Sequence, residues 1–217
     1  MARRKPPPPR GPQLELAGEL YVAFVNTAGA RPDNRQQGVS NFAELVTWSR
    51  QIGAISAHEA RRLLQRAAER PAEAEKAFAR VATVRTSLAQ SFLATQRQQP
   101  LAQKSIDAFN QAVAESSLTH CLVSAEVGAA WSWAGDEDAL GTMLSPILSS
   151  AVEGMIAAKG RPHVRQCAAE GCQLFFVDRT PTGRRRWCEK KTCGHRAANL
   201  RYYHRTGKDL PRPWWPG

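Results

Sequence analysis

The sequence predicts a mainly α-helical protein with a small β-hairpin, in which a helical N-terminal domain precedes a compact metal-binding unit. Three observations support this fold class. Apolar residues recur at helical spacing through the first half of the chain, four of the five cysteines gather near the C-terminal end, and positive charge is concentrated around them. With 217 residues, of which 42% are hydrophobic, the chain can form one ordinary domain and a small one.

The first helices are predicted from apolar spacing and from their caps. Apolar residues after Leu14 indicate a mostly buried helix that ends near Asn26, and the polar segment from Arg31 to Val39 is expected to be a loop. Ser40 or Asn41 would cap the next helix, which closes at Gly53. Its apolar positions are Phe42, Leu45, Val46 and Ile52.

Three further signals predict the rest of the helical bundle. Ser56 and Glu59 have the spacing of a capping box, so a helix is expected to start there. Pro71 suits the first position of a longer helix. That helix carries a stripe at i, i+3, i+4 spacing, formed by Ala74, Phe78, Val81, Val84, Leu88 and Phe92. A further helix is expected from about Leu101 to Val113.

The period then changes from helical to β-like. Residues 118–124 and 127–133 are short, rich in β-formers and separated by two residues, which favours a hairpin. A final helix is expected over 139–158, capped by the acidic residues 136–138 and started or interrupted at Pro146. The fifth cysteine, Cys121, is most simply a packed small hydrophobe.

Three tryptophans are candidates for a ligand pocket in this domain. Trp131 and Trp133 are two residues apart and would share one face of a strand, and Trp48 lies on a predicted helix. A helical domain with a hairpin can leave a cavity between such residues. Tryptophan clusters are nevertheless more often plain core.

The four C-terminal cysteines form two matched pairs. Cys167 and Cys172 have four residues between them, as do Cys188 and Cys193, and fifteen residues separate the pairs. Two short turns that each present two thiolates are typical of a structural zinc site, and the second pair runs into a helix-like segment, 194–205. We therefore expect one Zn²⁺ per chain, bound by all four cysteines.

Other interpretations of the cysteines remain at this stage. Two disulfides would suit a secreted mini-protein, but the chain has no apolar signal segment at its start. An iron–sulfur cluster also takes four thiolates, and the spacing alone does not exclude it. If the four cysteines were unrelated buried thiols, the equal spacing within the two pairs would be unexplained.

The segment between the cysteine pairs predicts a hairpin. Residues 174–177 are apolar, 180–183 form a turn sequence, and 184–187 lead back to the second pair. Phe175 or Phe176 and Trp187 would cover the metal in place of a large core. The unit is expected to be a small treble-clef-like ββα zinc finger.

These residues resemble the CGNR zinc finger, a bacterial module named after the residues that begin its last helix. The resemblance rests on the four cysteines, on Phe176-Val-Asp178, on Arg185-Arg-Trp-Cys188, and on Gly194 and Arg196. The sequence departs from the family at His195, where the family has asparagine.

The N-terminal part carries a second resemblance. Phe24-Val-Asn-Thr27, with Trp48 in the following Leu45-x-x-Trp48 helix, is similar to the start of the ABATE domain, which precedes the finger in that family. The combination covers nearly the whole chain. It implies a stress-induced transcription regulator, in which the finger contacts DNA and the helical domain senses a ligand or partner.

Charge divides the chain into the same parts. The formal net charge is +10 for 159–217, +4 for 1–10 and −3 for 11–158. We expect a disordered basic arm (1–12), a helical domain (13–158), a finger (159–207) and a C-terminal tail (208–217). A basic module beside a near-neutral domain is typical of a protein that binds a polyanion, although a solubilising basic tail would look similar.

The predicted function is that of a DNA-binding regulator rather than an enzyme. The helical domain contains no Gly-rich phosphate loop, no His-Glu-x-x-His and no nucleophile elbow. Double-stranded DNA is the expected partner, and an adaptor for a protein or a structured RNA is the alternative. A cytoplasmic protein without a membrane span is expected; the oligomeric state is not predicted. The candidate nucleic-acid contacts are Arg184, Arg185, Arg186, Lys190, Lys191, His195, Arg201, Tyr202 and Arg205.

Overall fold

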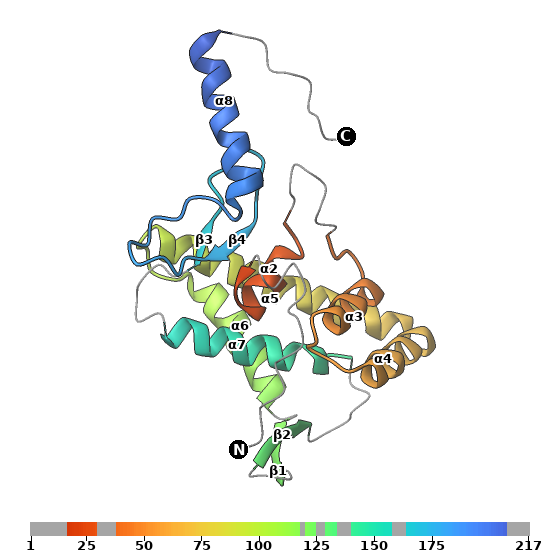
Figure 1. Cartoon of the computed structure of the whole chain (residues 1–217). Coiled ribbons are helices and arrows are strands. Elements are labelled where there is room, and N and C mark those ends of the chain that lie inside the picture. The colour runs from red at the N-terminus through yellow and green to blue at the C-terminus, as the bar shows by residue number, and fades with distance from the viewer. Residues whose placement is uncertain are drawn as a thin grey trace, which may run out of the picture.

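The computed structural model of the chain describes residues 17–29, 38–117, 120–124, 129–133, 140–157 and 164–207. Within these residues, six helices pack together in the N-terminal part (Figure 1). They are α2 (Leu20–Asn26), α3 (Phe42–Gln51), α4 (Ala57–Glu69), α5 (Pro71–Gln96), α6 (Gln103–Ser117) and α7 (Ser145–Ala157). The basic arm, the C-terminal tail and the acidic cap at 136–138 lie outside the described residues.

The helix starts predicted for α3, α4 and α5 are present. The Asn41 side chain accepts a hydrogen bond from the Glu44 backbone at 2.9 Å and starts α3. Ser56 and Glu59 form both hydrogen bonds of the capping box of α4, and Pro71 occupies the first turn of α5. Local sequence therefore fixes where these helices begin.

Helix α2 is the centre of the helical core. Tyr21, Val22 and Phe24 are almost fully buried, and α2 contacts both α5 and α7. It begins only at Leu20, because Gly18 has a φ of 87° and Glu19 is extended. A side chain at Gly18 would also meet the Val177 side chain at 3.3 Å, so this position needs glycine on two grounds.

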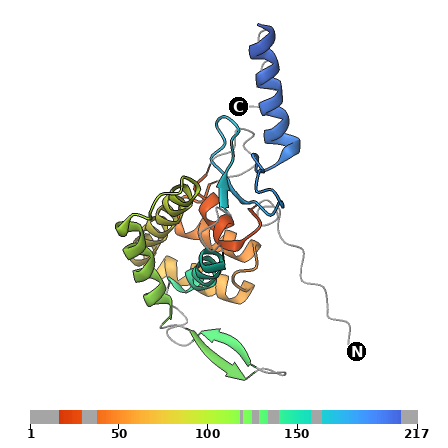
Figure 2. The same ribbon diagram turned by 90° about the vertical axis from the view of Figure 1, so that its left-hand side faces the viewer.

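The first hairpin consists of β1 (His120–Ser124) and β2 (Ala129–Trp133), with His120 opposite Trp133. Its strands confirm the predicted change of period. In both views the hairpin projects from the end of the helical part that is opposite the finger (Figures 1 and 2). Helix α7 then begins at Ser145, next to Pro146, after a short 3₁₀ turn at Thr142–Leu144.

The finger consists of β3 (Val164–Gln166), β4 (Phe175–Val177), a π-helical turn (Lys190–Gly194) and α8 (His195–Thr206). The predicted turn is present, with the Gly183 N–H donating to Thr180 O at 3.0 Å. The prediction that 174–177 forms a hairpin with 184–187 was wrong, because β4 pairs with β3 instead. The reason is that the Arg185 N–H donates to the Asp178 carboxylate at 2.9 Å, while the Arg186 carbonyl accepts from Ala168.

The finger packs directly on the helical part. Val164, Phe175 and Val177 belong to the same hydrophobic core as α2 and α5, whereas Leu174 and Phe176 pack around the cysteines. The strand β4 is thus shared between the two cores, and β3 contributes Val164 to the helical one. No helix in the described ranges has both the length and the apolar composition needed to cross a membrane.

Candidate metal centre

The first cysteine pair lies on a tight turn between β3 and β4. The Cys167 N–H donates to Leu174 O at 2.8 Å and extends the hairpin, and the Cys172 N–H donates to Ala169 O at 3.0 Å. Gly171 has a φ of 70°, a conformation that glycine adopts without strain. These bonds turn both thiols towards the same side.

The second pair lies at the start of the last helix. Cys188 precedes the π-helical turn, and Cys193 lies within it. The Cys188 N–H points to the sulfur of Cys167 at 3.4 Å. Gly194 packs against Trp187, and an added Cβ would lie 3.4 Å from the indole ring, at contact distance.

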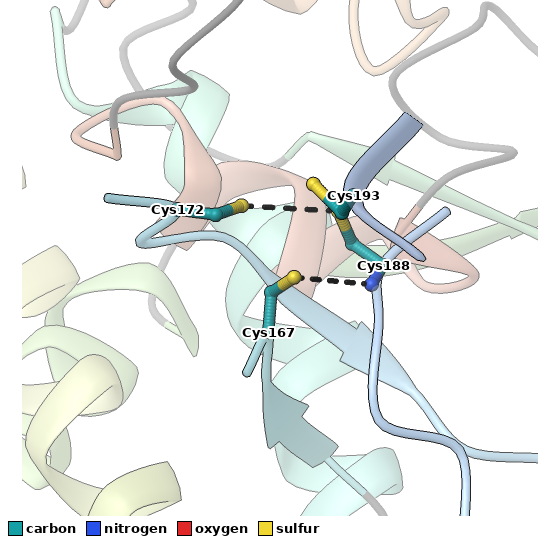
Figure 3. Close-up of side chains that lie close together, drawn as sticks. All are labelled: Cys167, Cys172, Cys188 and Cys193. Carbon is teal, nitrogen blue, oxygen red and sulfur yellow. Dashed lines mark hydrogen bonds between the residues drawn. The ribbon is translucent and has the colours of Figure 1, made fainter. Parts of the chain in front are cut away.

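The four sulfur atoms converge on one point (Figure 3). All lie within 4.8 Å of one another, with 3.9 Å between Cys172 and Cys188 and 3.6 Å between Cys188 and Cys193. Four thiolates about 2.3 Å from a zinc ion would be about 3.8 Å apart at the corners of a tetrahedron. The arrangement therefore fits one tetrahedral zinc ion, and all four cysteines are buried.

The same distances bear on the other interpretations of the cysteines. The four thiols are free, and their separations are far longer than a disulfide bond of about 2.05 Å. An iron–sulfur cluster places several atoms between its thiolates and needs a wider arrangement than this one. A structural zinc site is the interpretation that the geometry supports. Cys121 lies in β1, and its side chain is outside the described part.

The thiols interact strongly with one another. Hydrogen bonds from Cys172, Cys188 and Cys193 lower the pKa of the Cys167 thiol far below its usual range. The pKa of Cys188 is raised, chiefly because its thiol interacts with the sulfur of Cys167. A divalent cation at the centre would let all four ionise, since it neutralises thiolates that otherwise repel one another.

Arg185 supports the centre from outside. Its guanidinium lies 4.4 Å from the centroid of the Phe176 ring. It donates to the backbone carbonyls of Trp187 at 3.0 Å, Val177 at 3.4 Å and Cys188. Arg185 was predicted as a nucleic-acid contact, but its guanidinium is bound within the finger. These contacts join β4 to the second cysteine pair.

Two other charged residues also hold the finger together. Asp178 is buried and accepts from Thr180 and from the Arg185 N–H. Burial alone would raise the pKa of Asp178, but these hydrogen bonds and the nearby charge of Arg165 together lower it. Arg196 donates to the Glu170 carbonyl and so ties α8 to the first cysteine turn.

The remaining candidate contacts lie on exposed parts of the finger. Arg184 and Arg186 are exposed in the loop after β4, and Arg186 lies 5.5 Å from the Trp187 ring. Lys190, Lys191 and His195 are exposed where α8 begins. Helix α8 projects away from the rest of the molecule (Figures 1 and 2), and none of its residues is buried.

The helical spacing of α8 orients its side chains largely as predicted. Ala197 and Leu200 are half-buried on the inner side, together with Tyr203. His204 was expected there but is exposed, because α8 projects away from the rest of the molecule (Figure 1) and no residue of this helix is buried. Ala198, Arg201, Tyr202 and Arg205 are exposed, with Tyr202 at 44%.

The predicted tryptophan pocket is only partly within the described residues. Trp48 is buried in the core, with its ring 6.2 Å from that of Phe24. The hairpin that carries Trp131 and Trp133 projects away from α3 in both views. The side chains of these two residues are outside the described part, so the pocket stays a prediction.

The fold and the site together define a class, that of proteins in which a helical domain carries a four-cysteine zinc finger. Residues 163–206 match the family model of the CGNR zinc finger. Residues 18–158 match that of the ABATE domain, described as "Putative stress-induced transcription regulator". Since the latter match covers more than half of the chain, the protein belongs to the ABATE family. No curated protein matches the sequence significantly.

The structure also assigns a place to residues whose role was not predicted. Asn26 and Thr27 close the Phe24–Thr27 motif, and both are buried at the junction with the finger. The Asn26 amide bonds to the backbone of Phe175, and Arg85 reaches Thr27 from α5. A buried asparagine at a helix end was the available signal, since such a side chain needs a polar partner.

Proposed function

We propose that the protein binds double-stranded DNA through α8 and regulates transcription. The observation that carries this proposal is the position and charge of α8. The helix projects from the zinc-held finger, and the segment from Lys190 to Thr206 contains basic residues but no aspartate or glutamate. A projecting basic helix has the dimensions and the charge to enter the major groove.

The outer face of α8 supplies the base contacts in this proposal. Arg201 and Arg205 are four residues apart and exposed, so they lie on one side with Tyr202 beside them. Neither arginine has an ion-pair partner among the described residues. Arginine can donate two hydrogen bonds to guanine, and the small Ala198 on this face permits close approach to the bases.

Phosphate contacts would come from the base of the finger. Arg184, Arg186, Lys190 and Lys191 are exposed there, and His195 begins the helix beside them. Such contacts hold the protein on the backbone without reading sequence. Arg185 is not included, because its guanidinium is committed to Phe176 and to backbone carbonyls.

The helical domain is the regulatory part in this proposal. It supplies most of the buried core on which the finger packs, and the 11–158 segment has a net charge of −3, so it does not attract DNA. It would bind a small molecule or a protein partner and pass the signal to the finger. We place the regulator in the cytoplasm, where DNA is accessible in a bacterium.

The test is selection of genomic DNA fragments by the purified zinc-loaded chain, followed by titration of the selected duplex at several salt concentrations. Enrichment of one motif and a steep salt dependence are expected. Replacing Lys190 and Lys191 by alanine should weaken binding to all duplexes alike and reduce the salt slope by about 2. Tighter binding to structured RNA than to any duplex, or capture of a protein with no DNA enrichment, would support the adaptor instead.

A further inference from the structure

The side chain of Asn26 pairs with the backbone of the finger. Its Nδ2 donates to Phe175 O at 2.8 Å, and its Oδ1 accepts from the Phe175 N–H at 2.7 Å. Asn26 is only 3% exposed. This pair of hydrogen bonds has the pattern of two residues that face each other across an antiparallel sheet. The end of α2 thus occupies the edge of β4 that β3 leaves open.

The residues around Asn26 are fixed in the helical domain. Phe24 is fully buried, and Thr27 donates to the Phe24 carbonyl at 2.6 Å. Arg85 on α5 donates to Thr27 Oγ1 at 2.9 Å and to Val39 O at 3.2 Å. The motif Phe24–Thr27 is therefore held from α5 on one side and holds β4 on the other.

Further contacts support the junction from the finger side. The Phe175 ring meets that of Phe92 on α5 edge to face, with 5.5 Å between their centroids. The Gln166 N–H donates to Gln96 Oε1 at 2.9 Å. Arg179 donates to Gly18 O at 3.0 Å and forms an ion pair with Glu19. The junction thus combines buried apolar area with satisfied polar groups, and it involves both strands of the finger.

The junction is next to the metal centre. Phe175 follows Leu174, whose carbonyl accepts the hydrogen bond from Cys167, and it is three residues from Cys172. The strand that presents its backbone to Asn26 is therefore the one that positions the first cysteine pair. A shift of β4 would alter both the Asn26 bonds and the geometry of the sulfur atoms.

We infer that Phe24–Thr27 is a coupling element that makes the helical domain and the metal centre one cooperative unit. Zinc binding orders α2 through Phe175 and Asn26, and a change in α2 or α5 alters zinc affinity through the same bonds. The two effects must be equal in free energy, since coupling between two sites is reciprocal. The inference concerns the chain and its metal, and it holds whether or not α8 binds DNA.

The first test follows amide hydrogen exchange in the unmodified full chain before and after removal of zinc with a chelator. Exchange should speed up in α2 and in the 87–96 part of α5, which contact the finger. It should change little in α4, which packs against α3 and α5. Unchanged exchange in α2 after complete loss of zinc would overturn the inference.

The second test measures zinc affinity in an Asn26→Ala variant by competition with a chromophoric chelator. Affinity should fall about tenfold or more, as for other residues that orient metal ligands indirectly. Ser49→Ala is the matched control, because Ser49 on α3 is also buried but its hydroxyl contacts the Met143 sulfur, 3.8 Å away, within the helical domain. Equal zinc affinity in the two variants would refute the coupling. If Asn26→Ala does not fold, the exchange experiment decides.

Discussion

The guanidinium of Arg185 lies over the ring of Phe176, 4.4 Å from its centroid, and fastens β4 to the second cysteine pair. Arg185→Ala should destabilise the zinc-bound finger by about 2 to 4 kcal/mol, because it removes a cation–π contact and charged hydrogen bonds to buried backbone. Chelator competition would show this as easier zinc loss. Arg184→Ala is the control, since Arg184 is exposed and should leave zinc affinity unchanged. Equal zinc retention in both variants would contradict the role given to Arg185.

The metal content of the purified chain is a separate prediction. The four buried thiols should hold about one zinc ion per chain, and the protein should be colourless. Cys188→Ser should abolish stoichiometric zinc, because serine replaces a thiolate that faces two other sulfur atoms at 3.9 and 3.6 Å. Elemental analysis is the measurement. Brown protein with iron and sulfide would rule out the zinc assignment.

Gly154 in α7 is predicted to tolerate no side chain. A Cβ there would lie 2.5 Å from the Tyr21 hydroxyl, so Gly154→Ala should destabilise the helical core by about 1 to 3 kcal/mol. The usual effect of alanine in a helix is the opposite, a gain of about 1 kcal/mol. Gly141→Ala is the control, because no atom lies within 4 Å of its Cβ. Chemical denaturation of both variants gives the sign, and a more stable Gly154→Ala would show that the packing is loose.

The stability of the helical core should depend on alkaline pH through Tyr21. Burial, together with the charge of Glu19, raises the pKa of Tyr21 to about 12 from about 10 in an unfolded chain. The fold favours the neutral phenol, so its contribution is complete below pH 10 and is lost as pH rises towards 12. The loss amounts to about 3 kcal/mol.

Tyr21→Phe isolates that effect, because phenylalanine keeps the ring that lies 5.6 Å from Phe92. The variant should lose less stability than the parent between pH 10 and pH 12 in denaturant titrations. Parallel curves for the two proteins over this range would mean that Tyr21 ionises as easily in the folded chain as in the unfolded one.

Features set by short-range sequence were predictable. Three predictions used residues within a few positions of each other: the capping box at Ser56, the proline start of α5 and the metal site at the equally spaced cysteine pairs. The structure contains both helix starts and brings the four cysteines together. Short segments with distant partners were not predictable. The strand β3 has three residues, and nothing local shows that it pairs with β4.

The roles of individual side chains needed the fold. Arg184, Arg185 and Arg186 are chemically identical neighbours, yet only Arg185 is turned towards Phe176 and three backbone carbonyls. Asn26 and Phe175 are 149 residues apart, so their pairing leaves no trace in any short window. His204 has the helical phase of the inner face, but phase alone does not tell how far α8 extends beyond the finger.

The most direct test of the account is duplex binding by an Arg201→Ala/Arg205→Ala variant that retains its zinc. Both arginines are exposed on α8, so their loss should leave the fold intact while lowering affinity for the selected site by about 1 to 3 kcal/mol per base contact. An Arg50→Ala/Arg61→Ala variant removes the same charge from exposed positions on α3 and α4 and should bind as the parent does. If the α8 variant, fully loaded with zinc, binds the selected duplex as tightly as the parent, α8 does not read DNA and the proposed function is wrong.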